Sequence, residues 1–534
     1  MPNHLIKSSS SLTRVKQGLF FIAIIIAALY VNPTFFNKLS TFVIRPGSLA
    51  NKIISIGIFL TLNALFILFV WMLAKATWKT KTFFLTLIII SLLIFDTYYL
   101  INGSSITFFS YLSLKSSFSS IDDAVLAYQG VIIKSILMIL PLCILIIFHK
   151  TSPKKHLFSF KNLSLLFCLQ IGLIAGIVYH KKTGEGADGL PPGILAYAYE
   201  TDIGLQHLLA PAPQARHLNS ESVTSHPFQN IVLIVDESIH ADFINADTTP
   251  NLMSVPSLLN LGQATSYANC SQYSNILLRK MARVNHETED ANANYYIWDA
   301  LKSAGYHSVL IDAQGGGRNH NFFTDAEINQ IENINTSNFK NDVDTAYAIN
   351  AVLSNGQYNF IYVIKQGAHF PFFNDDITKV FTPTMQSSLI SNESEEAIIN
   401  SYKNMIRHNT DAFFATLNTQ SPNTVFIYTS DHGQNLYNLS ERMTHCTVES
   451  PRASEGQVPL VLFGDFKQQN FSHFMQQLLT LSPSHYLIPF MVLDFAGYSE
   501  AAIESLMNQP QSVHSFVHGN VFGFFGGQPD RTNI

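Results

Sequence analysis

The sequence predicts two domains of different classes, an α-helical membrane domain followed by an α/β domain built around a central, largely parallel sheet. The long apolar runs fall almost entirely before residue 180, and the remainder is rich in Asn, Ser, His and Asp. In that remainder, two continuous apolar runs, 230–235 and 424–429, are followed by acidic residues at 236–237 and at 431. Segments with helical patterns lie between the apolar runs, as expected where strands alternate with helices.

Length and composition bound the possible classes of protein. A chain of 534 residues is too long for one ordinary domain, and a mean hydropathy of +0.17 with 13% charged residues indicates that part of it lies in lipid. A net charge of -5 provides no basic surface for nucleic acid, which we exclude as a partner. We expect a transmembrane domain over 1–182, a linker over 183–227 and a soluble domain over 228–534.

The N-terminal domain is expected to contain about five transmembrane helices. A helix needs about 20 apolar residues to cross roughly 30 Å of hydrocarbon. Five runs approach this length: 18–36, 53–74, 82–101, 125–148 and 163–179. The first run contains Asn32-Pro33 and has the alternative of a signal peptide. No small-residue cleavage site ends it, and we therefore expect a retained helix.

The basic residues predict the orientation of these spans. Lys and Arg are concentrated in 7–16, 75–81 and 150–161, which all lie on the cytoplasmic side if the N-terminus does. An odd number of crossings then leaves everything after residue 182 outside the cytoplasm. In a bacterium with two membranes, this predicts a multi-pass inner-membrane protein whose C-terminal domain lies in the periplasm.

The segment that joins the two domains contains an amphipathic stretch, 194–209, with prolines on both sides. This pattern predicts a linker with a short helix that lies at the membrane surface. An ordinary soluble helix is the alternative.

Three residues at the ends of two predicted core strands form a candidate metal site. Glu237 follows the run 230–235, and Asp431 and His432 follow the run 424–429. Ligands of parallel sheets lie beyond the carboxyl ends of the strands. Two carboxylates and an imidazole suit zinc, with manganese as the alternative. Taken singly, each residue has an ordinary explanation as a helix cap, a solvated group or part of a turn.

These residues resemble the phosphoethanolamine transferases that modify lipid A and related glycolipids, within the alkaline phosphatase and sulfatase superfamily. The resemblance covers nearly the whole chain. It rests on Glu237 in the segment Val-Asp-Glu-Ser, on Ser-Asp-His-Gly at 430–433 and on Val-Pro at 458–459. It implies that Glu237, Asp431 and His432 bind Zn²⁺.

The resemblance also implies a nucleophile. Family members have a catalytic threonine four residues after a cysteine, and this position after Cys270 is Ser274. Ser274 is therefore our predicted nucleophile and fourth metal ligand, and Ser271 is the alternative. A helix predicted over 275–283 would offer backbone N–H groups to a phosphate. A simple N-cap role for Ser274, and an inactive protein that lacks the threonine, remain open.

Further residues are implied as contacts to the phosphoryl oxygens. His369 matches the histidine of a Gly-x-His-x-Pro-like segment, His445 matches a histidine downstream of Asp-His-Gly, and Arg318 matches a position that is usually lysine. The family usually has several disulfides in this domain. Of the four cysteines, Cys143 and Cys168 lie in apolar runs and are expected to be small buried hydrophobic residues. The remaining two, Cys270 and Cys446, have the option of pairing in an oxidising compartment.

The function implied by the resemblance is transfer of phosphoethanolamine from phosphatidylethanolamine to a glycolipid such as lipid A, through a covalent phosphoserine. The expected partners are this donor, the glycolipid acceptor and membrane lipids. One alternative is a polymerase of glycerol phosphate from the same superfamily, and another is an inactive member that binds glycolipid. A hydrolytic sulfatase is a third, but Cys270 lacks the proline and arginine of the Cys/Ser-x-Pro-x-Arg motif.

Overall fold

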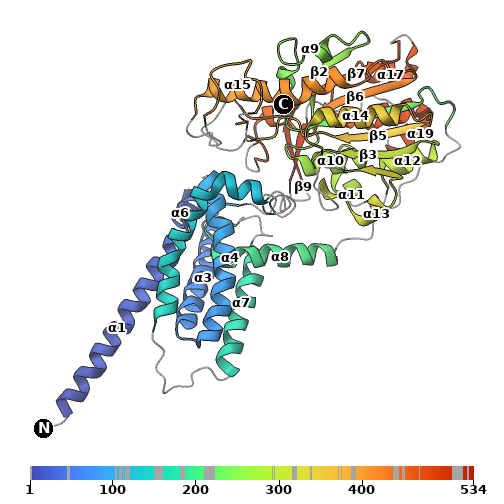
Figure 1. Cartoon of the computed structure of the whole chain (residues 1–534). Helices are drawn as coiled ribbons and strands as arrows, with labels where there is room; N and C mark the ends of the chain where they lie inside the picture. The colour runs from blue at the N-terminus through green and yellow to red at the C-terminus, as the bar shows by residue number, and fades with distance from the viewer. Residues whose placement is uncertain are drawn as a thin grey trace. The chain divides into compact units, whose positions relative to one another are not determined.

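The structure is a computed structural model of the whole chain (Figure 1). It describes residues 3–44, 48–102, 105–106, 111, 114, 121–149, 160–180, 187–209, 223–291, 293, 295–314, 321–336, 339–370, 372–374, 376–386, 393–436, 444–447, 451–467, 470–507, 521–525 and 528–533. The chain divides into two compact units. Unit 1 comprises Met1–Leu112 and Ser120–Pro211, and unit 2 comprises Ser113–Ser119 and Ala212–Ile534.

Unit 1 is helical, as predicted. Its helices are α1 (Asn3–Tyr30), α2 (Phe35–Ile44), α3 (Leu49–Ala74), α4 (Trp78–Asn102), α6 (Ile121–Phe148), α7 (Phe160–His180) and α8 (Pro192–Leu209). In the part of the chain that the structure describes, α3, α4, α6 and α7 contain stretches long and apolar enough to cross a membrane. Counting α1 and α2 as one bent span gives five. The expectation of about five spans is thereby confirmed.

The first predicted span is broken. The apolar part of α1 and the whole of α2 meet at an angle of 75°. The break contains Asn32-Pro33, and proline has no backbone N–H to continue a helical hydrogen-bond ladder. The Asn32 side chain, which is 4% exposed, donates to the carbonyl oxygens of Gly189 and Leu190. The residue that weakens the span in sequence thus anchors the segment that leads into α8.

The predicted linker helix is α8, and one of its faces belongs to the core of unit 1. Ile194, Leu195, Ala198 and Tyr199 are at most 2% exposed and pack in the same hydrophobic cluster as residues of α3, α4 and α7. In Figure 1, α8 runs crosswise to α4 and α7. This helix therefore packs on the apolar bundle, which distinguishes it from an isolated soluble helix.

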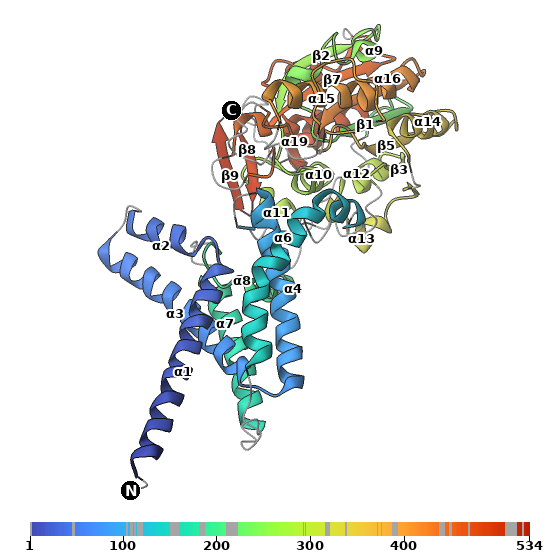
Figure 2. The ribbon, with the colours of Figure 1, turned by 60° about the vertical axis from the view of Figure 1, so that its left-hand side comes forward.

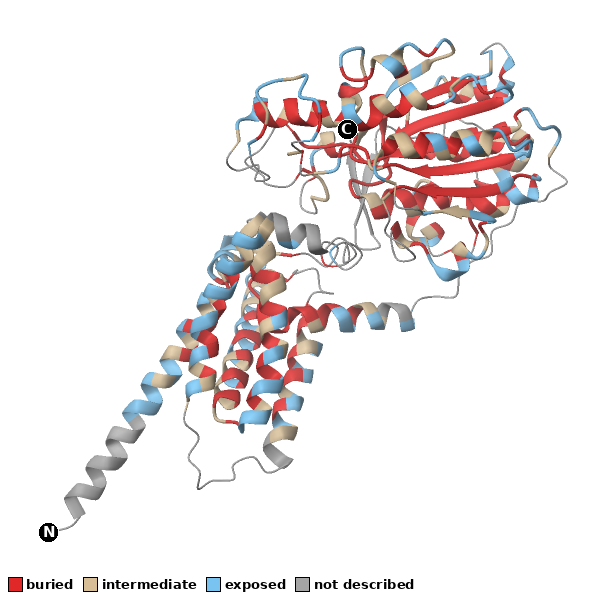
Figure 3. Cartoon of the chain, in the orientation of Figure 1, coloured by how far each residue is buried: buried red, intermediate tan, exposed pale blue. Residues whose placement is uncertain are grey.

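Unit 2 contains a seven-stranded sheet in the order β2-β7-β6-β1-β5-β3-β4. Its strands are β1 (Asn230–Asp236), β2 (Leu259–Thr265), β3 (His307–Asp312), β4 (Asn333–Asn335), β5 (Asn359–Ile364), β6 (Thr424–Ser430) and β7 (Gln457–Gly464). The β2–β7 and β6–β7 pairs are antiparallel, and the other pairs in this sheet are parallel, so β7 runs opposite to the other six strands. Every residue of β1, β5 and β6 is buried, as Figure 3 shows, which explains their continuous apolar sequences. The prediction of a largely parallel α/β domain is confirmed.

Helices cover both faces of this sheet. On one face, Val232 and Ile234 of β1 pack in a cluster with residues of α14 (Asp342–Leu353), α15 (Glu395–Ile406) and α16 (Ala412–Thr416). On the other, Trp298 of α12 (Ile297–Ser303) contacts the rings of Phe360 and Tyr362 in β5. Both faces of the central strands are thereby removed from water.

The remaining elements of unit 2 are short. The α-helices are α9 (Pro250–Met253), α10 (Ser271–Arg279), α11 (Glu287–Ala291), α13 (Asp325–Ile328), α17 (His473–Leu478), α18 (Ile488–Phe495) and α19 (Glu500–Leu506). The other helical turns are η4 (Ala241–Phe243), η7 (Arg407–Asp411), η8 (Ala453–Glu455) and η10 (His485–Leu487). A separate hairpin of β8 (Val521–Phe525) and β9 (Gln528–Asn533) is visible in Figure 2.

Candidate functional site

The carboxyl ends of β1 and β6 bring the predicted metal ligands together. These strands are parallel neighbours, and Asp236 pairs with Ser430, so the residues that follow each strand lie side by side. Ligand atoms of Glu237, Asp431 and His432 all lie within 4.8 Å of one another, and the three residues are at most 2% exposed. Gly433 is needed here because a Cβ at this position would collide with the backbone oxygen of Ser454.

The orientation of His432 suits a metal ligand. Its Nδ1 lies 2.7 Å from the carbonyl oxygen of Gly433. An acceptor at this distance requires the proton on Nδ1, which leaves the Nε2 lone pair directed at the carboxylates. Nε2 lies 3.4 Å from Glu237 Oε1 and 3.8 Å from Asp431 Oδ2. Asp431 Oδ2 is buried and accepts no hydrogen bond within the described residues. A buried carboxylate oxygen that accepts no hydrogen bond, next to an imidazole lone pair, is suited to bind a divalent cation.

The pKa shifts of these three residues also indicate that the cluster is stabilised by positive charge. Burial acts to raise the pKa of the Glu237 carboxyl, but the hydrogen bond and charge of His432 hold that pKa well below its usual range. Burial and the charge of Glu237 raise the pKa of Asp431 well above its usual value. Burial acts to lower the pKa of His432, but Asp431 and Glu237 together raise it to about 9. A bound dication would supply the positive charge that the protonated ring otherwise provides.

The serine beside these ligands is Ser271, not Ser274. Ser271 Oγ lies 3.3 Å from Glu237 Oε1 and 3.2 Å from His432 Nε2. The hydroxyl of Ser274 instead donates to the carbonyl oxygen of Ala268 at 3.0 Å and accepts from the Ala268 N–H at 3.1 Å. The helix α10 begins at Ser271, so Ser274 lies one turn inside it and its side chain points back over the first turn. The predicted role of Ser274 as metal ligand and nucleophile therefore has to be corrected.

The two predicted phosphate-contact histidines lie next to the cluster. The ring of His445 stacks on that of His432 with centroids 4.4 Å apart, and His369 meets His445 edge to face at 6.2 Å. Burial, followed by the charges of His432 and His369, holds the pKa of His445 well below its usual value, so this ring is neutral. The side chain of His369 is exposed. Arg318 lies outside the described residues.

Two polar residues at the site escaped the sequence analysis. Gln314 Nε2 donates to Glu237 Oε2 at 2.8 Å and to the carbonyl oxygen of Lys365 at 2.9 Å. Ser238 Oγ donates to Glu237 Oε1 at 2.7 Å. An amide in a glycine-rich loop carries no metal-binding signal by itself. Ser238, however, directly follows Glu237, and this adjacency was a usable signal.

A disulfide joins Cys270 to Cys446, with Cα atoms 4.9 Å apart. Cys270 caps the N-terminus of α10, directly before Ser271, and Cys446 directly follows His445. The Cys446 N–H also donates to the carbonyl oxygen of Asn269 at 2.8 Å. Two segments that are far apart in sequence are thus tied together beside the cluster.

The other two cysteines are free and belong to unit 1. Cys143 is buried, as expected. Cys168 is exposed, and the expectation of burial was wrong for this residue, because it lies on the face of α7 that turns away from the helical core.

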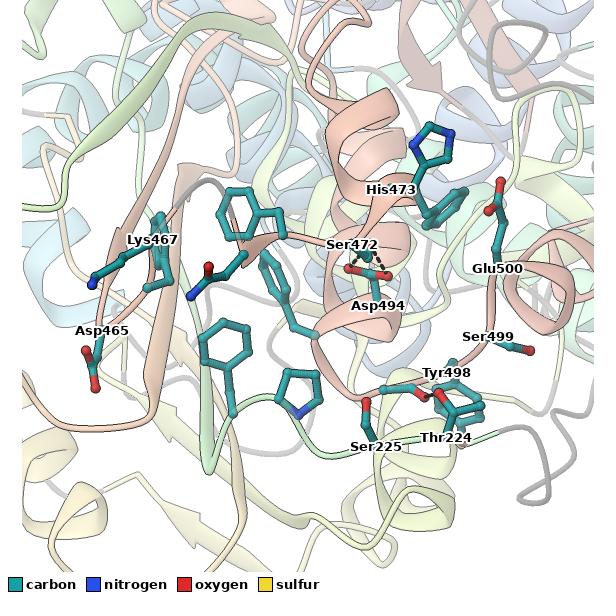
Figure 4. A pocket seen from close by; sticks show the side chains of 18 residues that line it. Thr224, Ser225, Asp465, Lys467, Ser472, His473, Asp494, Tyr498, Ser499 and Glu500 are labelled. Carbon is teal, nitrogen blue, oxygen red and sulfur yellow. Dashed lines mark hydrogen bonds between the residues drawn. The ribbon is translucent and has the colours of Figure 1, made fainter.

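A pocket of 520 Å³ lies at the end of the central strands that is opposite the metal-ligand cluster (Figure 4). Residues that precede β1 and residues that follow β7 line it, including Phe228 and Asp465. The hydroxyl of Ser472 bonds to the Asp494 carboxylate inside it, as the figure shows. Phe228 precedes the amino end of β1, and Asp465 follows the end of β7 that pairs with the amino end of β6, whereas the metal-ligand cluster lies at the carboxyl ends of β1 and β6. The pocket is therefore separate from the cluster.

Comparison with known proteins identifies the family. A model of the sulfatase family matches residues 229–518. The chain belongs to the sulfatase family. Among curated proteins, none has a significant sequence match to the chain.

Solved structures similar to this sulfatase-family protein include the integral membrane lipooligosaccharide phosphoethanolamine transferase A (EptA) from Neisseria meningitidis. That match has a TM-score of 0.64 and 15% identity, and covers 90% of this chain and 96% of EptA. The C-terminal periplasmic domain of EptC from Escherichia coli, in complex with Zn, matches with a TM-score of 0.44 and 17% identity, over 59% of this chain and 94% of that domain. Because the match to EptA covers 90% of this chain, both units share its fold.

Proposed function

We propose that this protein is a membrane-bound phosphoethanolamine transferase that uses Ser271 as its nucleophile. The observation that carries the proposal is the contact of the Ser271 hydroxyl with Glu237 and His432, at the first residue of α10. Support comes from an EptA-like fold that extends over the apolar helices as well as the α/β unit. Lipooligosaccharide phosphoethanolamine transfer is the activity for which EptA is named.

Zinc is the metal that we propose for the cluster. Glu237, Asp431 and His432 would hold it, since two carboxylates and an imidazole nitrogen are a ligand set that zinc accepts, as does manganese. When bound, the cation lowers the pKa of an adjacent hydroxyl and so supplies a nucleophile at neutral pH.

The chemical step proposed for Ser271 is a displacement at phosphorus. Ser271 Oγ attacks the phosphorus of phosphatidylethanolamine, and the bond from phosphorus to the diacylglycerol oxygen breaks. Diacylglycerol leaves with the proton that Ser271 gives up, and phosphoethanolamine remains on Oγ. A hydroxyl or phosphate of the glycolipid acceptor, such as lipid A, then attacks the same phosphorus, and the bond from phosphorus to Ser271 Oγ breaks. The acceptor's proton returns to the Ser271 oxygen.

Several groups of the chain would stabilise the phosphoryl oxygens during both displacements. The first-turn N–H groups of α10 offer donors and the positive end of the helix dipole. His369 and His445 adjoin the cluster, and we assign Arg318 to the same role on the family resemblance. These groups act where negative charge develops, so they lower the barrier to transfer.

The location that we propose is the bacterial inner membrane, with residues 228–534 in the periplasm. The apolar helices support membrane insertion, and the distribution of Lys and Arg supports this orientation. Donor and acceptor are both lipids, and anchoring the enzyme in the same bilayer replaces a three-dimensional search for them.

Mass spectrometry of lipopolysaccharide tests the proposal. Cells that express the protein should contain glycolipid with one added phosphoethanolamine, and fragmentation would locate it on lipid A or on the core sugars. Cells that express Ser271→Ala, at equal protein level, should lack the added mass. An added glycerol phosphate would instead support a polymerase of the same superfamily, and an unchanged glycolipid profile would reject the proposal.

A further inference from the structure

Two loops of unit 2 carry residues of the site and lie in direct backbone contact. One follows β1 and carries Glu237, and the other follows β5 and carries His369. The Lys365 N–H donates to the carbonyl oxygen of Val235, and the Ala368 N–H donates to that of Glu237, both at 3.0 Å. Gly367, at a φ of 57°, allows this approach, because a Cβ there would lie 2.6 Å from Asp236 Oδ1.

The Lys365 side chain lies beneath this contact and is fully buried. Its ammonium is 2.6 Å from Asp236 Oδ2 and 3.4 Å from Asp342 Oδ2, and all three side chains are 0% exposed. It also donates to Thr410 Oγ1 at 3.3 Å and lies 4.6 Å from the centre of the Phe413 ring. A lysine ammonium has three donors, and these oxygen acceptors are sufficient to use all of them.

Each of the two carboxylates holds the backbone of one loop. Asp236 Oδ1 accepts the N–H of Glu237 at 3.0 Å. Asp342 accepts the N–H groups of Gln366 and Gly367 at 2.8 and 3.0 Å. The ammonium therefore joins one carboxylate that fixes the start of the Glu237 loop to another that fixes the His369 loop.

We infer that Lys365 is a positioning residue, which sets the placement of Glu237 and of His369 relative to each other through Asp236 and Asp342. The metal and phosphate roles of these two residues rest on the proposed function, whereas the placement of the loops does not. Without the ammonium, two buried carboxylates would face each other with no cation between them, and the loops would separate to admit water.

The first test compares Lys365→Met with Arg283→Met in the full chain in detergent. Arg283 forms another buried ion pair of unit 2, 2.7 Å from Asp290 of α11, and both residues lie outside the segments 235–240 and 365–369. Amide hydrogen exchange in 235–240 and 365–369 should become at least about tenfold faster in Lys365→Met and should stay unchanged in Arg283→Met. Equal exchange of these segments in Lys365→Met and in the natural protein would overturn the inference.

Metal binding gives a second readout. Replacement of a residue that orients a metal ligand weakens affinity by about 10–100-fold. Lys365→Met should show this loss for Zn²⁺ and an altered absorption spectrum with Co²⁺, while Arg283→Met should keep both properties. A Co²⁺ spectrum and Zn²⁺ affinity identical to those of the natural protein would count against the role for Glu237.

Asp342→Asn tests the connection to the His369 loop without changing the connection to the Glu237 loop. It also provides a test if Lys365→Met does not fold. It removes one of the carboxylate acceptors of the His369 loop and leaves Asp236 with its cation. Exchange should rise at 365–369 alone, with Zn²⁺ affinity within about twofold of the natural protein. Equal increases in both loops, or in neither, would contradict the assigned connections. If the natural protein transfers no phosphoethanolamine, the proposed function fails, and the exchange measurements still decide this inference.

Discussion

The charge of the site depends on a single histidine. His432 lies between two buried carboxylates, and its Nδ1 donates to Gly433, so Nε2 faces Glu237, Asp431 and the Ser271 hydroxyl. Ser271 is thus next to the centre of positive charge, whether that charge is a proton or a cation. With a cation bound to these residues, an adjacent hydroxyl would lose its proton more easily than one in water.

The two serines of α10 should respond differently to replacement. Ser271→Ala should lower phosphoethanolamine transfer by about 1,000-fold or more, because the attacking oxygen is gone. Ser274→Ala should retain transfer within about tenfold and should lower stability by about 1–3 kcal/mol, because the buried N–H and C=O of Ala268 lose a partner. Transfer rates and denaturant midpoints of both variants check this. The reverse order of activities would restore Ser274 as the nucleophile.

At the scale of elements, the site is formed by three loops that follow strands of the sheet and by the N-terminus of one helix. The loops after β1 and β6 supply the proposed metal ligands, the loop after β5 supplies His369, and α10 supplies Ser271 at its first residue. The β-sheet fixes the positions of the three loops, because neighbouring parallel strands have their carboxyl ends on the same side of the sheet. The position of α10 depends on side-chain contacts and on the disulfide.

Loss of the disulfide should therefore affect activity as well as stability. In the double variant Cys270→Ser and Cys446→Ser, the start of α10 and the His445 segment lose their covalent link and keep only hydrogen bonds, such as that from the Cys446 N–H to the carbonyl oxygen of Asn269. We expect kcat/KM to fall by about tenfold and stability by roughly 2–5 kcal/mol, because the linked residues are 176 positions apart. Transfer assays and thermal unfolding measure both effects. Cys168→Ala is the control, since this exposed thiol is free. Full activity of the double variant would show that the link has no role at the site.

At the scale of the whole molecule, the sheet of unit 2 is stable only while its buried polar groups keep their partners. His485 is fully buried near β6, and its Nδ1 accepts the Tyr267 N–H at 3.2 Å. Its Nε2 therefore carries the proton and donates to Thr429 Oγ1 at 3.1 Å. Burial lowers the pKa of His485 to about 3, which keeps the ring neutral in the folded protein.

This histidine predicts a dependence of stability on pH. Between pH 6.5 and about 3 the unfolded chain binds a proton at His485 and the folded chain does not, so stability is complete above pH 6.5 and falls as the pH decreases. From pH 7.5 to 5.5 the loss is about 1.4 kcal/mol for this residue. Denaturant unfolding of the natural protein and of His485→Gln, with metal chelated in both, should differ in pH dependence by this amount. Parallel pH profiles would contradict the buried neutral ring.

Sequence alone determined those features that depend on local pattern. Apolar runs of membrane length predicted unit 1, and continuous apolar runs ending in acids predicted both the central strands and the cluster of Glu237, Asp431 and His432. These inferences succeeded because strand burial dictates residue type along the strand, and parallel topology brings strand ends to one edge.

Tertiary structure decided which groups meet that cluster. The choice between Ser271 and Ser274 depends on where α10 begins and which way it points, and a spacing counted from Cys270 does not contain this information. Gln314 contacts Glu237 at a sequence separation of 77 residues, and Lys365 contacts Asp236 at a separation of 129, so local sequence pattern does not reveal either contact. The physical reason is that hydrogen bonds and ion pairs act over a few ångströms in space, and only the folded chain sets those distances.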